Sequence, residues 1–444
     1  MNPKIIVLDD DPTGSQTVHS CLLLTRWDVA TLKTALADAA PLFFILTNTR
    51  GMDAERAAEV THEVCANLKT ALTDYSGPVL FVSRSDSTLR GHYPVETDVM
   101  NDALGPFDAT LLTPAFFEGG RITRDSTHYL MVDGKPVPTH ETEFARDSVF
   151  GYRTAFLPDY VAEKTGGRVT ADSVQRLTLA DLRAGKASAW LAALHDNATG
   201  VVDGESADDY RIFANAVLKA AADGKRLLFR SAASLLTALA KLPPQPVAAE
   251  SFSTLVRNGR PGAIIVGSHV AKTTTQLGAL LKERGVVGLP LDVARLPGAR
   301  AAIVDELTAS IAHAHAQGLT PVVFTSRSEL AFASVAERLA FGEAVSGTLM
   351  DVVKRLPDTL GFLISKGGIT SNDVLSTGLE LTASRVLGQI LPGVTVVQTP
   401  PWHRLPTLPV VIFPGNVGSD GALAEAYRRL APSHAQASPA KLAA

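Results

Sequence analysis

The sequence predicts an α/β protein of two domains, each a mostly parallel β-sheet flanked by helices. Short apolar runs bounded by turn residues recur along the chain and alternate with longer stretches of helical period, which is typical of parallel sheets. Polar residues follow almost every one of these runs. Because the carboxyl ends of parallel strands form the ligand crevice of an open sheet, we expect these loops to line an active site in the cleft between the domains.

The composition of the chain is that of a large globular protein. Its 444 residues are 46% hydrophobic and 19% charged, which suggests two domains of about 200 residues each. The net charge of -4 lacks the basic excess of a nucleic-acid binder. Only two cysteines are present, so a disulfide framework is excluded. No apolar run approaches the roughly 18 residues of a membrane span and no signal peptide precedes the first strand, so we expect a cytoplasmic protein with no membrane partner.

The first domain is expected over residues 1–242. Behind Asp53, a plausible N-cap, apolar residues recur every four positions from Val60 to Leu72 and predict a helix. A second helical stretch begins at Ala207 and stops at Gly224. The expected strands are Lys4–Leu8, Leu42–Leu46, Pro78–Val82, Ala109–Leu112, Val201–Val202 and Leu227–Phe229.

A linker is expected over residues 243–262, where proline and glycine are concentrated, followed by a second domain over residues 263–430. Residues 431–444 are rich in Ala, Ser and Pro and predict a disordered tail. Thr370 and, three positions on, Asp373 predict a capping box at a helix start. The expected strands are Ala263–Val266, Pro321–Phe324, Phe362–Ile364, Val394–Val397 and Val410–Phe413.

The most informative stretch lies at the end of the first strand, where Asp9, Asp10 and Asp11 are followed by Pro12 and Gly14. Adjacent carboxylates repel one another, and Pro12 and Gly14 prevent an immediate helix, so folding stability does not require these acids. A bound ligand is the better explanation. A carboxylate held at a strand end can accept a proton, hold a metal ion or act as a nucleophile.

One alternative makes Asp9 a nucleophile. Asp9, Asp11 and Thr13 fit the D-x-D-x-T motif of haloacid-dehalogenase-type phosphatases. That mechanism needs a later acidic pair after another strand, but Asp208-Asp209 opens a predicted helix. The phosphatase also leaves the glycine loops of the second domain unexplained, so we keep it as the alternative.

The loops of the two halves differ in chemistry. Those of the first half combine acids with arginines, a combination that suits a polyhydroxylated acid, because arginine binds carboxylates in bidentate fashion and carboxylates accept hydrogen bonds from hydroxyls. Those of the second half are rich in Gly, Ser and Thr and suit a nucleotide phosphate. The segment from Gly267 to Thr273 is one residue short of a Walker A motif, so we reject a P-loop. His128 and His140 lack metal-ligand spacing, and no metal site is predicted. The arginines in the loops of the first half are Arg50, Arg84, Arg90 and Arg121.

Four motifs in order along the chain resemble those of the four-carbon acid sugar kinase family. The resemblance implies an N-terminal domain that binds a sugar acid and a C-terminal domain that binds ATP, with Mg²⁺ carried on the nucleotide. It implies phosphate transfer to the terminal hydroxyl of an acid such as threonate, erythronate or 3-oxo-tetronate. The motifs are Asp10-Asp11-Pro12-Thr13-Gly14, Asp86-Ser87-Thr88-Leu89-Arg90-Gly91, Gly367-Gly368-Ile369-Thr370 and Pro414-Gly415-Asn416-Val417-Gly418.

The resemblance and the chemistry of the loops together assign the site residues. Asp11 or Asp10 would orient and deprotonate the attacking hydroxyl. The residues expected to bind the acid are Asn48, Arg50, Arg84, Asp86, Ser87 and Arg90, and those expected to bind ATP are Ser268, Gly367, Gly368, Ile369, Thr370, Gly415 and Asn416.

The chain departs from the family pattern at three positions. Val270 replaces a serine that the first nucleotide loop often has, Phe413 and Pro414 stand where a lysine often precedes the last glycine loop, and Arg84 stands where many members have a lysine. The altered nucleotide loops leave open a non-catalytic sugar-acid sensor. The expected partners are the sugar acid and ATP, and a homodimer is left open.

Overall fold

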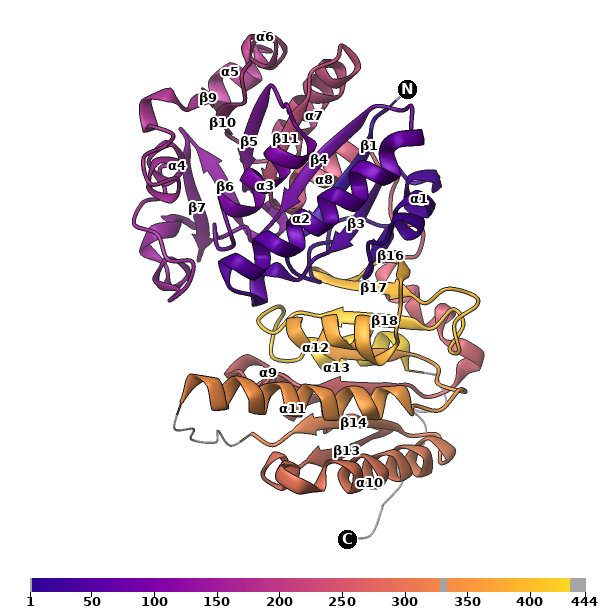
Figure 1. Ribbon diagram of the computed structural model, residues 1–444. Helices are drawn as coiled ribbons and strands as arrows, with labels where there is room; N and C mark the ends of the chain where they lie inside the picture. Colours follow the sequence, from indigo (N-terminus) through magenta and orange to yellow (C-terminus); the bar gives the residue numbers. More distant parts are fainter. Residues whose placement is uncertain (1, 328–333, 432–444) are drawn as a thin grey trace. The chain divides into compact units, whose positions relative to one another are not determined.

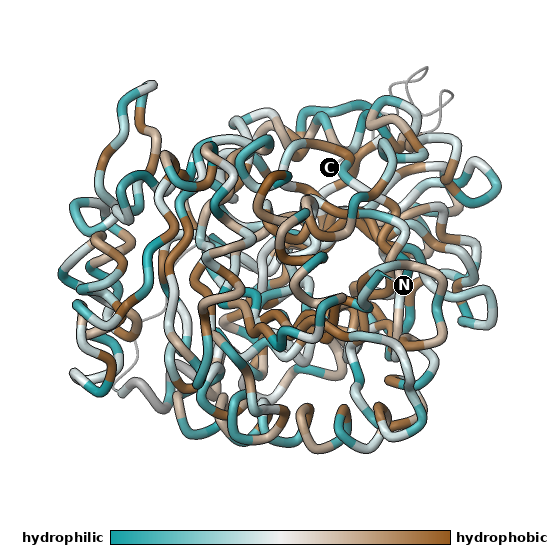
Figure 2. Tube along the Cα trace, turned by 90° about the horizontal axis from the view of Figure 1, so that it is seen from above, coloured by the Kyte–Doolittle hydropathy of each residue, from teal (hydrophilic) through white to brown (hydrophobic). Residues whose placement is uncertain are grey.

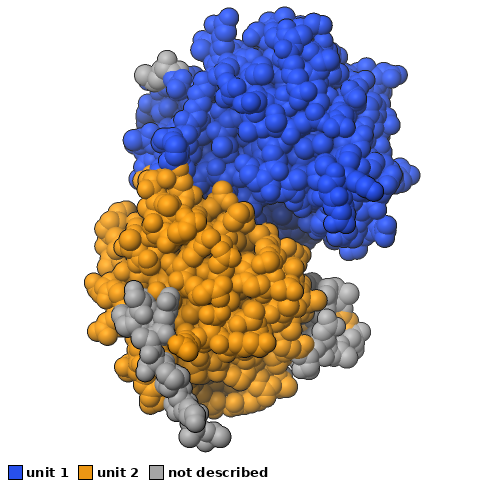
Figure 3. Space-filling model, turned by 180° about the vertical axis from the view of Figure 1, so that it is seen from behind, with its two compact units in different colours: residues 1–244 blue, residues 245–444 orange. Residues whose placement is uncertain are grey.

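The computed structural model describes residues 2–327 and 334–431. The chain forms two compact units, Met1–Pro244 and Gln245–Ala444 (Figure 3). Residues 245–262, predicted as part of a linker, therefore belong to the second unit, and Phe252 is fully buried in its core. The predicted tail lies, beyond Ala431, outside the described residues. Each unit is an α/β structure with a mostly parallel sheet, as predicted.

The first unit contains a sheet of parallel strands with a hydrophobic interior. The order β2-β3-β1-β4-β11-β5-β10-β9 differs from the order along the chain because helices connect the strands. The central strand β1 is buried along its whole length, and its last residue Asp9 lies beside Leu46 and Arg84. The bounds are β1 Lys4–Asp9, β2 Leu22–Leu24, β3 Leu42–Leu46, β4 Val79–Arg84, β5 Ala109–Thr113, β9 Gln175–Leu177, β10 Ala198–Val202 and β11 Leu227–Ser231.

Helices cover both faces of this sheet, with α2 and α3 on one face and α7 and α8 on the other (Figure 1). The Asp53 side chain accepts a hydrogen bond of 2.8 Å from the Arg56 amide and caps α2, as predicted. Helix α7 begins at Ala207, where Ser206 and Asp209 form a capping box. The bounds are α1 Val29–Ala37, α2 Ala54–Ala71, α3 Val95–Leu104, α4 Leu157–Lys164, α5 Leu179–Arg183, α6 Ala187–Ala193, α7 Ala207–Ala222 and α8 Ala233–Ala240.

Residues 116–174, called the insert below, connect β5 to β9. They include a separate antiparallel sheet of β6 (Arg121–Arg124), β7 (Thr127–Val132) and β8 (Lys135–Pro138), followed by helix α4. This sheet was not predicted from the sequence, because its strands are short, polar and only partly buried.

The sheet of the second unit has the order β13-β14-β12-β15-β18-β17-β16. The pairs from β13 to β18 are parallel, and β17 pairs antiparallel with β18 and β16. The strands are β12 Ala263–Val266, β13 Val286–Leu291, β14 Thr320–Thr325, β15 Leu363–Lys366, β16 Ala383–Leu391, β17 Val394–Gln398 and β18 Pro409–Phe413, and the helices are α9 Ala271–Leu280, α10 Leu296–Ala316, α11 Val335–Lys354, α12 Gly368–Asp373 and α13 Ala422–Leu430.

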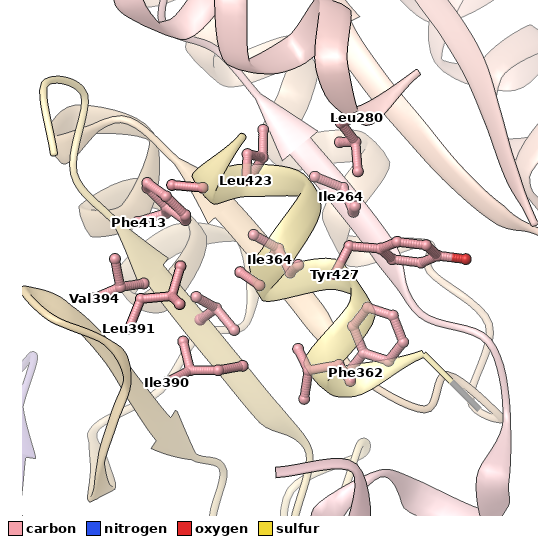
Figure 4. Packing of buried hydrophobic residues seen from close by; sticks show 14 of the residues in the cluster. Ile264, Leu280, Phe362, Ile364, Ile390, Leu391, Val394, Phe413, Leu423 and Tyr427 are labelled. Atoms are coloured by element: carbon pink, nitrogen blue, oxygen red, sulfur yellow. The ribbon is translucent and has the colours of Figure 1, made fainter. Parts of the chain in front are cut away.

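The core of the second unit lies between the sheet and helices α9 and α13. Phe362, Ile264 and Tyr427 pack together there (Figure 4). Hydrophobic segments are concentrated along the interior strands, whereas hydrophilic segments are mostly outer helical turns and loops (Figure 2). None of the helices within the described ranges is both long and apolar enough to cross a membrane.

The predicted capping box at Thr370 is wrong. Helix α12 starts at Gly368 with Gly367 as N-cap and has no side-chain cap, so Thr370 lies inside the helix. Asp373 is the last residue of α12 and accepts a hydrogen bond from Ser346. The S/T-x-x-D spacing is therefore present, but it starts three residues beyond the actual N-cap.

Candidate functional site

In the first unit, Asp9 and Arg84 form a closed ion pair at the ends of β1 and β4. Arg84 Nη1 lies 3.1 Å from Asp9 Oδ1, and the two side chains are 5% exposed or less. Burial raises the pKa of Asp9 to about 7, and Arg84 opposes this rise. A Cβ added at Gly14 would overlap the Asp9 carboxylate, so the chain itself covers this acid. Asp9 is thus in no position to accept a phosphoryl group, and Arg84 does not face outward as the predicted carboxylate ligand.

Asp10 and Asp11 share Arg50 but differ in accessibility. Arg50 donates to both Asp10 oxygens, with Nε 3.2 Å from Oδ2, and Ser85 Oγ donates to Oδ2 at 2.6 Å. The Asp10 side chain is only 1% exposed, whereas that of Asp11 is 21% exposed. Asp11 Oδ2 lies 3.4 Å from Arg50 Nη1, and Oδ1 accepts a hydrogen bond of 2.8 Å from the Thr13 amide. Asp11 is therefore the member of this pair that a ligand can reach.

The charge state of Asp11 follows from the same contacts. Burial alone would raise the pKa of this carboxyl, but Arg50, Arg84 and the Thr13 hydrogen bonds outweigh burial and lower it below the usual value. Asp11 is ionised at neutral pH as a result. An ionised carboxylate accepts hydrogen bonds only, which is what an approaching hydroxyl requires.

Residues 85–91 after β4 bring Asp86 and Arg90 together. Arg90 Nε donates to Asp86 Oδ2 at 2.7 Å, and Arg90 Nη1 lies 3.7 Å from Asp147. Burial would raise the pKa of Asp86, but Arg50 and Arg90 hold it well below the usual value. Both side chains keep some exposure, 15% for Asp86 and 29% for Arg90. Ser87, by contrast, is buried.

A second buried ion pair supports this edge of the sheet and was missed in the sequence. Arg230 at the end of β11 donates to Glu96 Oε2 at 2.6 Å and to Ser83 Oγ at 2.7 Å. Glu96 Oε1 accepts a hydrogen bond of 2.6 Å from Thr49 Oγ1. Arg230 also lines a small pocket together with Asp86. Arg230 directly follows an apolar run, and this position could have marked it as a candidate residue at a strand end. Nothing in the sequence, however, shows that β11 lies between β4 and β5.

Asn48 and Arg121 complete the first edge. Asn48 has a positive φ of 55° and precedes the 3₁₀ turn Thr49–Gly51, which directs Arg50 to Asp10. The Arg121 guanidinium donates to the Gly119 carbonyl and lies 6.0 Å from the centroid of the Phe116 ring. Its Nε has no hydrogen-bond partner within the described ranges. The same is true of Arg84 Nε. Arg121 differs from Arg50, Arg84 and Arg90 in that it forms no ion pair among the described residues.

In the second unit, three of the predicted nucleotide loops meet. A Cβ at Gly367 would lie 3.0 Å from Ser268 Cβ, and one at Gly267 would overlap Thr370 Oγ1. Thr273 Oγ1 donates to Ser268 Oγ at 3.2 Å and to the Gly415 carbonyl at 3.3 Å. The loops after β12, β15 and β18 are thus in contact, and the predicted residues Ser268, Gly367, Thr370 and Gly415 lie together. Ile369, Asn416 and the half-buried Gly368 lie at the accessible side of these loops.

Lys366 is a further candidate for the nucleotide site and was not among the residues predicted from the sequence. It is the last residue of β15, is paired in register with Phe413 and is fully buried. Its Nζ donates to the carbonyls of Pro414 and Gly415, the latter at 3.0 Å, and lies 4.4 Å from the centroid of the Phe413 ring. Burial, with a smaller contribution from Lys272, lowers the pKa of Lys366 to about 7. Its ammonium group lies under the last glycine loop.

Arg327 is a second cation beside these loops. Its guanidinium donates to the Ser268 carbonyl at 2.7 Å and to Thr325 at the end of β14. Lys366 and Arg327 hold backbone carbonyls of the glycine loops and bring positive charge beside them. In the part of the chain that the structure describes, no group of three or more His, Cys, Asp or Glu side chains could hold a metal ion.

Two family models match almost the whole chain. A sugar-binding N-terminal domain matches residues 5–239, and a nucleotide-binding C-terminal domain matches residues 263–423. The chain belongs to the four-carbon acid sugar kinase family. The boundary between the two matched domains agrees with the boundary between the two structural units.

Two proteins named as sugar-acid kinases are similar to part of the chain. A D-erythronate kinase of Heliobacterium modesticaldum is 30% identical over 167 residues, 36% of this chain and 36% of that protein. A D-threonate kinase of Bordetella bronchiseptica is 30% identical over 164 residues, 35% of this chain and 38% of that protein. The chain thus covers less than two fifths of each relative's length.

Solved structures share the fold over nearly the full length. A Salmonella typhimurium LT2 protein, provisionally named a tRNA synthase, aligns with a TM-score of 0.69 at 19% identity and covers 96% of this chain and 98% of its own. A Haemophilus influenzae protein from a family of unknown function, DUF1537, aligns with a TM-score of 0.67 at 18% identity. The alignment covers 96% of this chain and 100% of that protein. At such identities the likeness concerns the fold alone.

Proposed function

We propose that the protein is an ATP-dependent kinase that phosphorylates the terminal hydroxyl of a small, four-carbon sugar acid such as erythronate, threonate or 3-oxo-tetronate. The observation that carries the proposal is the edge of the first unit, where the ionised and accessible Asp11 lies beside Arg50, Asp86 and Arg90. The family models and the names of the two partial relatives support the same reaction.

Asp11 has the accessibility that the reaction demands. Its carboxylate accepts a hydrogen bond from the attacking hydroxyl, orients it and takes up its proton. Asp10 is too buried for this role and instead fixes the Arg50 guanidinium through two hydrogen bonds. Because phosphoryl transfer passes through a loose transition state, an orienting carboxylate need not be a strong base. The lowered pKa of Asp11 is therefore compatible with its role.

The carboxylate of the sugar acid is assigned to Arg121 and Arg90. Both side chains are partly exposed, and a guanidinium binds a carboxylate through charge-assisted hydrogen bonds. Asp86 accepts hydrogen bonds from the hydroxyls of the acid. Arg84 remains paired with Asp9 and stabilises the strand ends from within.

The loops of the second unit fit the phosphates of a nucleotide. A Cβ at Gly267 would overlap Thr370, and the positive φ of 115° at Gly367 disfavours any other residue there. Lys366 and Arg327 bring positive charge beside both loops. ATP supplies the phosphoryl group, and Mg²⁺ bound to it reduces the charge that the transfer develops. The loops of this chain hold the phosphates in position.

An ADP-release assay over a panel of acids tests the proposal. D-erythronate, D-threonate and 3-oxo-tetronate are the first substrates, and inorganic phosphate is measured in parallel. Acid-dependent ADP release supports the kinase. Phosphate release from sugar phosphates without ATP would instead indicate a phosphatase, and acid binding without either product would indicate a sensor.

Substitutions separate Asp11 from Asp10. Asp11→Asn should lower kcat by about 10²- to 10⁴-fold and leave the affinity for Mg-ADP unchanged. Asp102→Asn removes the same charge from an exposed position on α3 and serves as the matched control. Full activity in Asp11→Asn would exclude Asp11 from the mechanism.

A further inference from the structure

The backbone of the Asp86–Gly91 loop is held by side chains at four consecutive carbonyl groups. The Ser87 carbonyl contacts His128 Nε2 at 2.7 Å, and the Thr88 and Leu89 carbonyls accept hydrogen bonds from Tyr152 and Tyr160 at 2.8 Å and 2.9 Å. The fourth, at Arg90, lies 2.9 Å from Ser85 Oγ, whose single proton it shares with Asp10 Oδ2. The first three donors all belong to the insert, although they are 41 to 71 residues away from the carbonyls they bind.

The three insert side chains are buried and act only as donors to the loop. His128, Tyr152 and Tyr160 are at most 5% exposed. A carbonyl oxygen only accepts, so His128 carries its proton on Nε2, and Nδ1 accepts from Thr123 Oγ1 at 2.9 Å. Burial lowers the pKa of His128 to about 4, which keeps the ring neutral. The contact therefore persists unchanged through the physiological pH range.

The loop needs external support because its backbone is strained. Leu89 has a φ of 67°, in the left-handed region that non-glycine residues avoid. Such a conformation persists only where the surroundings over-determine it. The carbonyl of Leu89 is the one that Tyr160 holds.

The insert also contacts the functional side chain of the loop. The centroid of the Phe144 ring lies 4.9 Å from Cζ of Arg90, and Asp147 Oδ2 lies 3.7 Å from Arg90 Nη1. Arg90 is thus held between Asp86 on its own loop and these two residues of the insert. Both the backbone and the arginine of the loop depend on residues 116–174 for their position.

We propose that the insert determines the affinity for the sugar acid, with His128, Tyr152 and Tyr160 as positioning residues for Asp86 and Arg90. This inference rests on the proposed function of the first unit as the sugar-acid site. The insert holds the loop through its backbone, so the loop sequence alone does not set the position of its side chains. Changes at His128, Tyr152 or Tyr160 would then alter acid selectivity without touching any residue that contacts the acid.

The test removes the two tyrosine hydroxyls and keeps both rings. In a Tyr152→Phe/Tyr160→Phe variant, the KM for D-erythronate, or for whichever acid of the panel is turned over, should rise about three- to tenfold per hydroxyl. The KM for ATP should stay within about twofold, because no nucleotide loop is altered. The amide hydrogens of residues 86–91 should exchange at least about tenfold faster with solvent.

Tyr427→Phe is the matched control. It removes a tyrosine hydroxyl that donates to the Arg284 carbonyl at 3.0 Å in the second unit, and it should change neither the acid KM nor the exchange of residues 86–91. If the double variant does not fold, Tyr160→Phe alone carries the test.

Two results would overturn the inference: unchanged exchange of residues 86–91, or an acid KM that shifts no more than in Tyr427→Phe. A loss of thermal stability alone, with both readouts unchanged, would reduce the tyrosines to a structural role. If the wild-type protein turns over no acid, the proposed function fails, and the exchange measurement still decides whether the insert holds the loop.

Discussion

Lys366 leads to a prediction about protons and nucleotide binding. In the free protein its pKa is about 7, because burial disfavours the ammonium form and Lys272 adds repulsion. At pH 8, one unit above this pKa, about nine tenths of the molecules carry a neutral Lys366. Nucleotide phosphates bound at the adjacent Gly367 and Gly415 loops favour the charged form and raise the pKa. Binding should therefore draw a proton from solution.

The expected uptake at pH 8 is about 0.9 proton per Mg-ADP bound, provided that the pKa in the complex exceeds 9. The sign of the pH dependence follows. Because the bound form holds a proton that the free form has lost, affinity falls as pH rises above 7, by up to about fiftyfold between pH 7 and pH 9. A lysine with its ordinary pKa would remain charged over this range and would give no such dependence.

Titration calorimetry of Mg-ADP in two buffers of different ionisation enthalpy measures the uptake directly. Lys366→Met should abolish it while retaining a side chain of similar volume for the core. Lys354→Met, an exposed lysine of α11 that pairs with Glu380, is the control and should bind the same number of protons as the wild type. An uptake near zero in the wild-type protein, or an equal uptake in Lys366→Met, would refute the reasoning.

Three further predictions concern single residues. Gly14→Ala should destabilise the first unit by about 1–3 kcal/mol in urea unfolding, because its Cβ would overlap the Asp9 carboxylate, which Arg84 holds in place. Arg121→Met should raise the KM for the acid by about 10- to 100-fold and leave that for ATP unchanged, whereas loss of activity with unaltered KM would contradict the assignment. Phe252→Ala should destabilise the second unit by about 3–5 kcal/mol and spare the first, as followed by hydrogen exchange of each sheet.

The strands that carry the site were predictable from the sequence because they are continuous apolar runs buried on both faces, such as β1 and β3. Strand β13 was missed for the opposite reason. It lies at the edge of its sheet, includes Gly288 and Pro290, and is only partly buried, so its sequence lacks a strand pattern. Edge strands are specified by the neighbour they pair with, which the local sequence does not reveal.

The same distinction applies to the site. Asp10, Asp11, Asp86 and Arg90 stand in short motifs directly after β1 and β4, so local sequence was enough to place them at this edge of the sheet. Lys366 was overlooked because the preceding strand was predicted to end at Ile364, whereas it continues through Lys366 and buries it. The insert tyrosines reach the 86–91 loop only through the tertiary fold, and no local pattern marks them.

The pairing of Arg50, Arg84, Arg90 and Arg230 with acids has a consequence for the speed of association. These arginines are neutralised by Asp10, Asp9, Asp86 and Glu96 before any ligand arrives. An approaching anion therefore meets little long-range field, and electrostatic steering contributes little to its capture. The association rate of the acid should be nearly independent of ionic strength. The site should distinguish the acid from simple inorganic anions only at close contact, through hydrogen bonds to the hydroxyl groups of the acid as well as through its charge.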